Sequence, residues 1–298
     1  LTASVIPTGR ISAAADQSGA DSNRNSSRLW WAGLRGLACR GARAVQPIGR
    51  SLERMARQGL LVRVGIDATD GWWNAPVRPS TGEFVYVPIT EVRRFRCRPT
   101  TFDEFEPALR SFGVPLPEHL VGVAAHLDPD FSTLTYGDRG QRARSIAQLK
   151  PGDFLVFYAS LRAAHQPKSP LIYSLVGYYD IAEIVPARNI PRARWTENAH
   201  TRRTPGSGDI VVRAAPGSGR LRFSLPIGEY RNRAYRVQHN ILRDWGGLAV
   251  KDGFLQRSAR LPRFLDPEKF LSWFQAHSCG LIADNNLLRY ACRPAASA

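Results

Sequence analysis

Histidine and carboxylate side chains that could exchange protons are concentrated in residues 126–139. The segment HLDPDF contains His126 and Asp128, and TYGDRG follows a few residues later. Histidine and carboxylates are the usual general acids and bases of enzymes, although an Asp-Pro pair is also typical of a simple turn. We therefore treat His126 and Asp128 as catalytic candidates whose roles stay open. The stretch also provides two nucleic-acid-binding candidates, Tyr136 and Asp138.

A second polar segment, residues 195–203, reads WTENAHTRR. It combines an aromatic ring, an amide, a histidine and adjacent guanidinium groups, which together can stack on a base and hold a phosphate. A solvated basic loop is the alternative. His200 is the third catalytic candidate. The nucleic-acid-binding candidates of this segment are Asn198, His200, Arg202 and Arg203.

Further candidates lie at predicted turns. Asp67 and Asp70 follow the first predicted strand, where they are either turn formers before Gly71 or ligands for a metal or a sugar hydroxyl. Trp72 comes next, and Lys251 belongs to a later polar cluster, KDG. We include all four side chains among the candidates for nucleic-acid binding.

None of these sets completes a known catalytic or cofactor signature. The sequence contains no nucleophile-and-base signature, P-loop, dinucleotide fingerprint or zinc-ligand spacing, and its His-x-Asp-x-Asp spacing matches no specific metal motif. We predict no metal and no cofactor. Three functions stay open: a module that recognises a modified or flipped nucleobase, an enzyme that modifies a nucleobase or nucleotide by acid-base chemistry, and a basic protein whose polar loops are structural.

Two long apolar strands are expected to position these side chains. A Pro-Gly-Asp turn precedes a predicted strand at 154–161, and a longer apolar run covers 171–185. The second run does not alternate between apolar and polar residues, which favours burial on both faces or coiling round a barrel. Gly177 in its middle favours a bulge. Four further strands are predicted at 60–68, 84–89, 209–214 and 221–227, of which the first two would form a hairpin or meander.

Three helices are expected beside the strands. A capping box begins the first, over 101–112, and Pro107 interrupts its pattern. Residues 235–245 have one apolar face, typical of a second helix, and a Gly-Gly stop follows. Asp266 is expected to cap a third helix, which ends near Gly280.

The composition indicates a globular protein with a basic surface. The chain has 298 residues, 43% of them hydrophobic, and a formal net charge of +16. This charge favours phosphate-bearing partners, although an arginine bias from genomic base composition explains part of it equally well. The sequence has no apolar run long enough to span a membrane, and its four cysteines lack paired spacing. We therefore predict free thiols, a cytoplasmic protein and no membrane partner.

One globular domain is expected over residues 59–292. Residues 1–58 are rich in Arg, Ser and Ala and poor in acids, and Met55 is the single methionine of the chain. We favour a disordered or translated leader upstream of a natural start at Met55, with a transit peptide as the alternative. Residues 293–298 are predicted to be a disordered tail.

The apolar strand pair resembles that of PUA-like domains, especially the EVE type. The matching order is PGD, LVFYAS, a variable loop and SLVGYYDIAEIV. Those domains are small β-barrels that hold modified nucleobases or RNA, so the resemblance implies that Tyr158 or Tyr179 stacks on a base at the barrel mouth. The expected fold is accordingly α+β, with a curved mixed β-sheet or a PUA-like β-barrel and flanking helices.

Over residues 60–286 the chain resembles the nucleotide modification associated domain 3 family. The segments that carry this likeness are GIDATDGWWNAP, HLDPDF, TYGDRG, GDFLVFYASL, ENAHTRR and GGLAVKDGFLQRSA. Trp72 and Trp73 replace part of a stretch that is glycine-rich in the family, which weakens the expectation of a close backbone approach to a ligand. The resemblance implies a role in DNA modification, recognising or handling a modified or flipped nucleobase. Expected partners are nucleic acid, DNA in the first place, or a nucleotide, and other DNA-modification proteins.

Overall fold

A computed structural model describes residues 56–69, 72–255, 259–278 and 280–286. The predicted leader up to Met55 and the predicted tail lie outside these ranges, so the expected domain boundaries stay predictions. Asp70 and the cysteines at 39, 279 and 292 also lie outside them. The fourth cysteine, Cys97, is a free thiol. No helix in the described ranges is long and apolar enough to cross a membrane.

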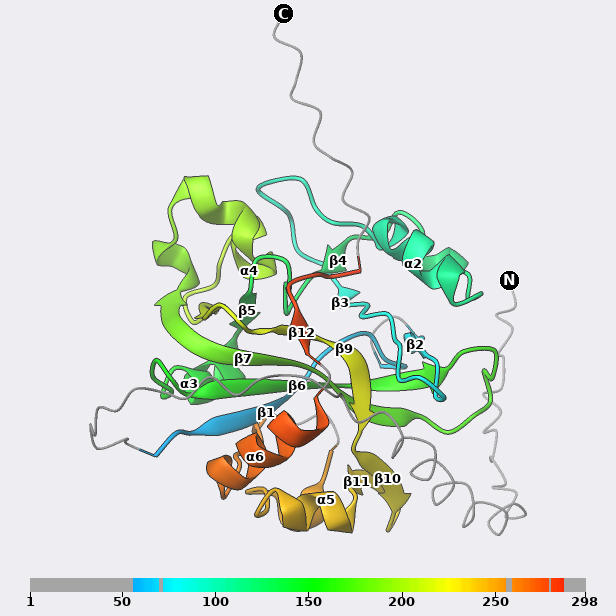
Figure 1. The fold of residues 1–298 in the computed structure, drawn as a ribbon. Helices are drawn as coiled ribbons and strands as arrows, with labels where there is room; N and C mark the ends of the chain where they lie inside the picture. Colours follow the sequence, from blue (N-terminus) through cyan, green and yellow to red (C-terminus); the bar gives the residue numbers. More distant parts are fainter. Residues whose placement is uncertain (1–55, 70–71, 256–258, 279, 287–298) are drawn as a thin grey trace, which may run out of the picture. The chain divides into compact units, whose positions relative to one another are not determined.

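A mixed sheet of eight strands forms the centre of the fold (Figure 1). Its strands are β1 (Gly59–Arg63), β2 (Pro76–Val77), β5 (Thr135–Asp138), β6 (Phe154–Ala163), β7 (Ile172–Pro186), β8 (Ile210–Ala214), β9 (Gly219–Pro226) and β12 (Leu281–Ile282). The main order is β1-β6-β7-β8-β5, with β2 also paired to β6, and β9 joining β7 to β12. β1 and β2 run parallel to β6, whereas the other pairs are antiparallel.

The predicted α+β class with a large mixed sheet is confirmed. The strands described by the structure form no closed barrel, so the PUA-like barrel stays unconfirmed. Two small ladders accompany the sheet, β3 (Ile89–Thr90) with β4 (Ala125–His126), and β10 (Gly228–Arg231) with β11 (Ala234–Val237).

Short helices cover both faces of the sheet. Those of the α type are α2 (Glu106–Ser111), α3 (Gly140–Ile146), α4 (Ala199–Arg202), α5 (His239–Asp244) and α6 (Pro267–His277). Those of the 3-10 type are η2 (Phe102–Phe105), η3 (Glu118–Leu120), η4 (Ala187–Asn189), η5 (Arg192–Glu197) and η6 (Lys251–Gly253). Figure 1 shows α5 and α6 on one side of the β6-β7 pair, and α2, α4 and the β3-β4 ladder on the other.

The long β6-β7 pair forms where the apolar runs predicted it, and the bulge lies at Gly177. The register shifts between Phe157, opposite Gly177, and Tyr158, opposite Leu175. A β-carbon on Gly177 would come within 2.5 Å of the Phe131 ring. The glycine therefore lets the strand bend while the ring packs directly against its backbone.

The terminal helix α6 also follows the prediction. Asp266 caps it by accepting a hydrogen bond from the Lys269 backbone N–H at 3.1 Å. The helix buries its aromatic residues against the sheet: the Phe270 ring is stacked on Phe154, with centroids 5.6 Å apart. Trp245 closes the same cluster from the end of α5.

The first predicted helix is present in two parts. Its capping box forms, because the backbone N–H of Thr101 donates to Oε1 of Glu104 at 3.1 Å. The turn that follows is the 3-10 helix η2, and α2 begins only at Glu106. Pro107, which has no N–H to donate, lies in the first turn of α2, where helices tolerate it.

The prediction of a helix over 235–245 is wrong for the first turn. Ala234–Val237 is β11, and α5 begins at His239. Asn232 and Arg233 have positive φ angles of 51° and 61° and form a tight hairpin turn between β10 and β11. Tyr235 stacks on Tyr173 with ring centroids 4.3 Å apart, and this contact requires the extended strand.

The hairpin or meander predicted from 60–68 and 84–89 does not form a paired strand ladder. β1 ends at Arg63 and pairs in parallel with β6. The second segment accepts a backbone hydrogen bond from Ile66 at Val87, 2.8 Å long, and makes an isolated bridge from Phe84 to Val77, while its end joins β4 through Ile89. The apolar strand β6 takes the place of the local partner, and the first four residues of β1 are buried.

Candidate functional site

Three catalytic candidates predicted from two separate segments converge in space. We refer to His126, Asp128 and His200 together as the His-Asp cluster. β3 pairs with β4, and His126 is the last residue of β4. Asp128 follows two residues later, while His200 lies in the first turn of α4. The two polar stretches expected to be loops therefore include short strands and helices, which carry His126 and His200, while Asp128 lies in the connection between β4 and β5.

The reactive atoms of the His-Asp cluster point toward one another. Nε2 of His126 lies 3.7 Å from Oδ2 of Asp128, and Nε2 of His200 lies 3.5 Å from the same oxygen. The two imidazole rings are 5.0 Å apart and inclined by 72°. One ligand atom from each residue falls within 4.8 Å of the others, so these three side chains could hold a metal ion.

Each imidazole has a carboxylate at its other nitrogen. Nδ1 of His126 lies 2.5 Å from Oε2 of Glu91, and Nδ1 of His200 lies 3.0 Å from Oδ2 of Asp209. Both carboxylates are nearly inaccessible to solvent. A carboxylate at Nδ1 keeps the proton on that nitrogen and leaves Nε2 as a base or ligand.

Asp128 is oriented through the oxygen that faces away from the histidines. Oδ1 accepts a hydrogen bond from the backbone N–H of Gly137 at 2.7 Å and one from Nδ2 of Asn198 at 3.2 Å. Asn198 also caps α4, because its Oδ1 accepts from the backbone N–H of His200 at 2.8 Å. One amide side chain therefore positions two members of the His-Asp cluster.

Gly137 is required by the closeness of this packing. A β-carbon at this position would lie 2.4 Å from Cδ2 of His200 and 2.6 Å from Oδ1 of Asn198. Both atoms belong to side chains fixed by other contacts, so the neighbours have little room to move.

A buried arginine links the two orienting carboxylates. Nε of Arg203 lies 3.5 Å from Oε2 of Glu91, and its Nη2 donates to Oδ2 of Asp209 at 3.1 Å. Burial lowers the pKa of Arg203, and these two carboxylates oppose that effect. The guanidinium predicted to clamp a phosphate is thus turned into the protein and braces the cluster.

The pKa values around the cluster follow from burial opposed by pairing. Burial lowers the pKa of His126, but hydrogen bonds and charges from Asp128 and Glu91 outweigh it and raise the pKa to about 8. Burial likewise works against ionised Glu91, yet His126 overcomes it and lowers the pKa of Glu91 to about 2. His200 has the same effect on Asp209, whose pKa falls to about 2. Both carboxylates are therefore ionised at neutral pH.

The His-Asp cluster lies in a cavity of about 450 Å³, which we call the site cavity. One wall is a linked set of polar groups in which the hydroxyl of Tyr136 donates to Asp138 at 2.5 Å and Arg142 donates to both. Burial raises the pKa of Tyr136 well above its usual value. Arg93 and Arg139 also line the site cavity and are exposed to solvent.

The other predicted residues do not reach the site cavity. Tyr158 is 2% exposed and its hydroxyl donates to the Leu255 carbonyl at 2.9 Å. Tyr179 is fully buried and donates to the Asp130 carbonyl at 2.9 Å. A ring buried on both faces cannot stack on a base, so the stacking expected of these two tyrosines is not supported.

Three further predicted site residues, two charged and one aromatic, also lie elsewhere. Asp67 is buried and pairs with Arg63, whose Nη2 lies 2.9 Å away. Arg202 is paired with Asp130 at 2.7 Å rather than open to a phosphate. Trp72 is 83% exposed but is not part of the cavity lining.

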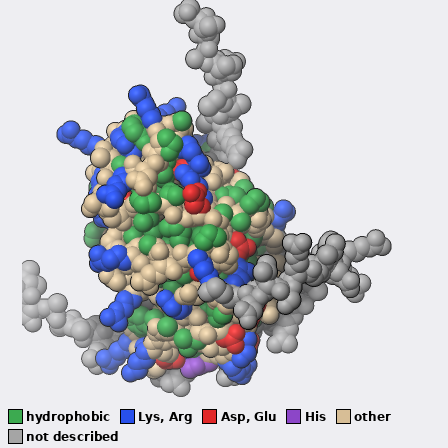
Figure 2. All heavy atoms as spheres, turned by 90° about the vertical axis from the view of Figure 1, so that its left-hand side faces the viewer, with side chains coloured by type: hydrophobic (Ala, Val, Ile, Leu, Met, Phe, Trp, Pro, Cys, Tyr) green, Lys and Arg blue, Asp and Glu red, His purple; other side chains and the backbone are tan. Residues whose placement is uncertain are grey.

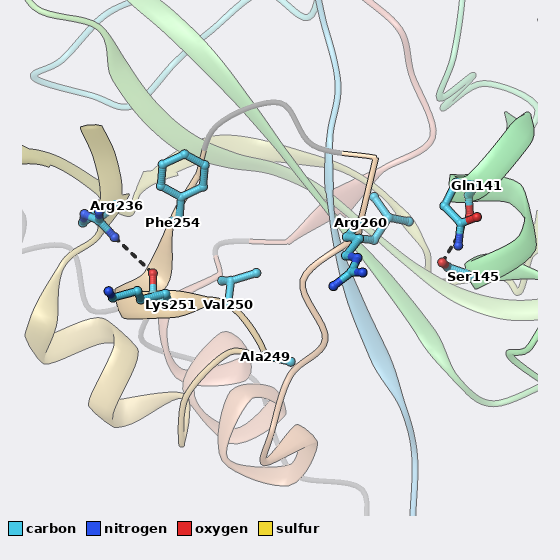
Figure 3. A pocket seen from close by; sticks show the side chains of 9 residues that line it. Gln141, Ser145, Arg236, Ala249, Val250, Lys251, Phe254 and Arg260 are labelled. Carbon is cyan, nitrogen blue, oxygen red and sulfur yellow. Dashed lines mark hydrogen bonds between the residues drawn. The ribbon is translucent and has the colours of Figure 1, made fainter. Parts of the chain in front are cut away.

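Lys251 lines a different cavity, of about 710 Å³. Figure 3 shows Lys251 and Arg236 on one side of this second cavity, and Gln141 and Ser145 of α3 on the other. Nη1 of Arg236 donates to the Lys251 carbonyl at 3.0 Å. Lys251 therefore does not join the His-Asp cluster.

Sequence reasoning missed several residues that the fold brings to the site. Glu91 and Asp209 flank strands, the first just after β3 and the second just before β8, and a polar residue at a strand end was the signal that could have identified them. No sequence motif links Glu91 to His126, 35 residues away, or Asp209 to His200, nine residues away. The cationic residues missed at the site cavity are Arg63, Arg93, Arg139 and Arg142.

A family model described as nucleotide modification associated domain 3 matches residues 58–246. This range includes the His-Asp cluster, both orienting carboxylates and the arginines of the site cavity. No curated protein and no solved structure matches the chain.

Proposed function

The chain belongs to the nucleotide modification associated domain 3 family, and we propose that it is an enzyme that acts on a nucleotide or a flipped nucleobase. Membership implies an association with nucleotide modification systems. The observation that carries the enzymatic proposal is the His-Asp cluster at the wall of the site cavity. Its members supply the reaction centre, and the cavity receives the substrate.

The free energy needed to bury the charged side chains of the site favours a catalytic function over a function in binding alone. Two histidines, three carboxylates and a guanidinium are held there with little exposure to solvent. Removing such charges from water costs several kcal/mol per ion, and the attraction between paired charges offsets only part of this cost. Perturbed titratable groups of this kind collect at catalytic sites because catalysis needs groups with shifted pKa values.

Arg93 and Arg139 are suited to bind the phosphate of the substrate. Both line the site cavity, both are exposed, and within the described residues neither guanidinium is ion-paired with a carboxylate. Arginine presents a planar fork of donors that matches phosphate oxygens. Figure 2 shows a face of the protein on which Lys and Arg side chains are many and acidic ones few, which favours approach of a polyanion.

The size of the site cavity favours one nucleotide unit over a duplex. About 450 Å³ lies within the range of roughly 300–1,000 Å³ that is usual for small-molecule sites. A base in double-stranded DNA reaches such a pocket only by leaving the stack. We therefore propose either a free nucleotide or an extruded base in DNA as the substrate.

The test is nucleoside mass spectrometry of DNA and of the nucleotide pool. Cells that carry the wild-type gene are compared with cells that carry Asp128→Asn, and with Asp244→Asn, an exposed aspartate remote from the cavity lining, as the matched control. We expect a mass change that is present with wild type and Asp244→Asn and absent with Asp128→Asn. Equal spectra in all three strains and in a deletion strain, with the protein folded and expressed, would refute the proposal.

A further inference from the structure

The two histidines of the His-Asp cluster both direct Nε2 toward one carboxylate oxygen. The separations of 3.7 Å and 3.5 Å from Oδ2 of Asp128 are longer than charge-assisted hydrogen bonds, which are about 2.7–2.9 Å. Two ligands on one tetrahedral metal ion, each about 2.1 Å from it, are about 3.4 Å apart. The spacing therefore fits a shared ion better than it fits direct pairing.

We propose that the His-Asp cluster binds one divalent first-row transition-metal ion. Its ligands are Nε2 of His126, Nε2 of His200 and Oδ2 of Asp128. The inference goes beyond the proposed function, because occupancy by an ion depends only on these three atoms and on no particular substrate. The ion draws the imidazoles slightly together from their present separation, since all three ligand atoms lie within 4.8 Å.

The protonation of both imidazoles suits metal binding. Oε2 of Glu91 and Oδ2 of Asp209 each lie within hydrogen-bond distance of an Nδ1, where they can hold the ring proton while the opposite Nε2 coordinates an ion. Carboxylate–histidine–metal chains of this form recur in metalloproteins. Two of them meet at one point in this fold.

Arg203 does not reverse this assignment. Its Nη2 lies 2.9 Å from Nδ1 of His200 and 3.1 Å from Oδ2 of Asp209. The carboxylate is the stronger acceptor for a guanidinium, and on this ground we assign the Arg203 hydrogen bond to Asp209 and the ring proton of His200 to Nδ1.

The third ligand, Asp128, is also oriented by hydrogen bonds to neighbouring groups. Oδ1 of Asp128 is already bonded to the Gly137 N–H and the Asn198 amide, and its other oxygen faces the two Nε2 atoms. A ligand oriented through its second oxygen loses little freedom when an ion binds.

The charge balance of the site has room for a dication. Among the described residues, three buried carboxylates surround the cluster with one buried guanidinium between them, so acidic side chains outnumber that basic one. A divalent ion cancels that excess. The carboxylates are those of Glu91, Asp128 and Asp209.

Two imidazoles and one carboxylate select the class of ion. Imidazole favours zinc, iron and their neighbours, whereas magnesium and calcium prefer oxygen ligands alone. Three protein ligands leave coordination positions open toward the site cavity, as in catalytic metal sites. Iron(II), zinc(II) and manganese(II) are therefore the ions to compare, with magnesium(II) as the negative control.

The test is equilibrium dialysis of the purified full chain, stripped with a chelator and then offered each ion alone, with elemental analysis as the readout. We expect about one equivalent of a transition ion per chain and no retained magnesium. Asp128→Asn and His200→Gln should each weaken binding at least tenfold, and His239→Gln, an exposed histidine, should leave it unchanged. A wild-type chain that retains no transition ion overturns the proposal, as do cluster variants that retain it fully.

Two further measurements keep the test decisive. The four cysteines of the chain are alternative ligands, so the cobalt(II)-loaded wild type is examined by absorption spectroscopy: a thiolate-to-cobalt band overturns the proposal, and its absence supports it. Thermal unfolding shows whether a variant is folded. In wild type the ion should raise Tm, and a folded Asp128→Asn chain should show no such shift.

The result of the metal-binding test is independent of the result of the nucleoside test for the proposed function. A chain that binds the ion in the expected way but leaves cellular nucleosides unchanged retains the metal site and loses the enzymatic proposal. A chain that changes nucleosides but binds no transition ion supports the enzymatic proposal and rules out the metal site.

Discussion

Nδ1 of His126 lies 2.5 Å from Oε2 of Glu91, and this contact sets the direction of the opposite ring nitrogen. Glu91 comes just after β3, and His126 is paired to the start of that strand. The same relationship recurs between Asp209 and His200 at 3.0 Å. Two separate strand ends therefore orient two imidazoles toward Asp128, and the predictions below follow from that arrangement.

Removing the charge of Asp209 should weaken the metal site without unfolding the protein. Asp209→Asn keeps the shape of the side chain but makes it a poorer acceptor for Nδ1 of His200. Loss of such an outer partner typically costs about 10- to 100-fold in metal affinity, and we expect this range for zinc(II) measured by competition with a chelator. Asp244→Asn is the control. Unchanged affinity in a folded Asp209→Asn chain would show that the carboxylate does not orient the ligand.

Gly137→Ala should both destabilise the fold and disturb the cluster. The added methyl group meets His200 at 2.4 Å and Asn198 at 2.6 Å, and overpacking of this kind costs about 1–3 kcal/mol. Denaturant unfolding monitored by tryptophan fluorescence gives the free energy. Gly208→Ala is the matched control, because its β-carbon would meet nothing within 4 Å. Equal stability of the two variants would contradict the packing described for Gly137.

Arg93→Gln and Arg139→Gln should each weaken nucleotide binding. Losing one charge-assisted hydrogen bond costs about 1.5–3 kcal/mol, or about tenfold or more in Kd. The logarithmic dependence of affinity on salt should also become shallower. Titration calorimetry with a nucleoside monophosphate at several salt concentrations measures both. Arg144 is an exposed arginine in the last turn of α3 and outside the cavity lining, so Arg144→Gln should bind like wild type. A similar loss there would point to general charge and not to a phosphate site.

Asp266→Ala should lower stability without touching the site. Its side chain accepts from the Lys269 N–H at the start of α6, and loss of such a cap costs about 0.5–2 kcal/mol. The free energy of unfolding should fall by that amount while zinc(II) binding is retained. Asp244→Ala, which removes an exposed aspartate that caps no helix, provides the comparison.

The sequence by itself determined the elements whose structure is local. The apolar runs predicted the β6-β7 pair, Gly177 predicted its bulge, and Asp266 followed by Pro267 predicted the start of α6. Backbone preferences and capping bonds act over a few residues, so they can be read from neighbouring side chains. The types of the reactive residues, His126, Asp128 and His200, were also visible, and so was the resemblance to the family that the chain matches.

Only the tertiary structure decided which of those residues share a site. β1 pairs in parallel with β6 and not with the segment that follows it in the sequence. Residues 234–237 form a strand paired with β10, in which Tyr235 stacks on Tyr173. Burial then separated similar side chains: Arg203 braces the cluster while Arg139 is exposed at the site cavity. Pairing energies between groups far apart in the chain depend on distances that only folding sets, and so the partnership of each histidine with its carboxylate had no local signature.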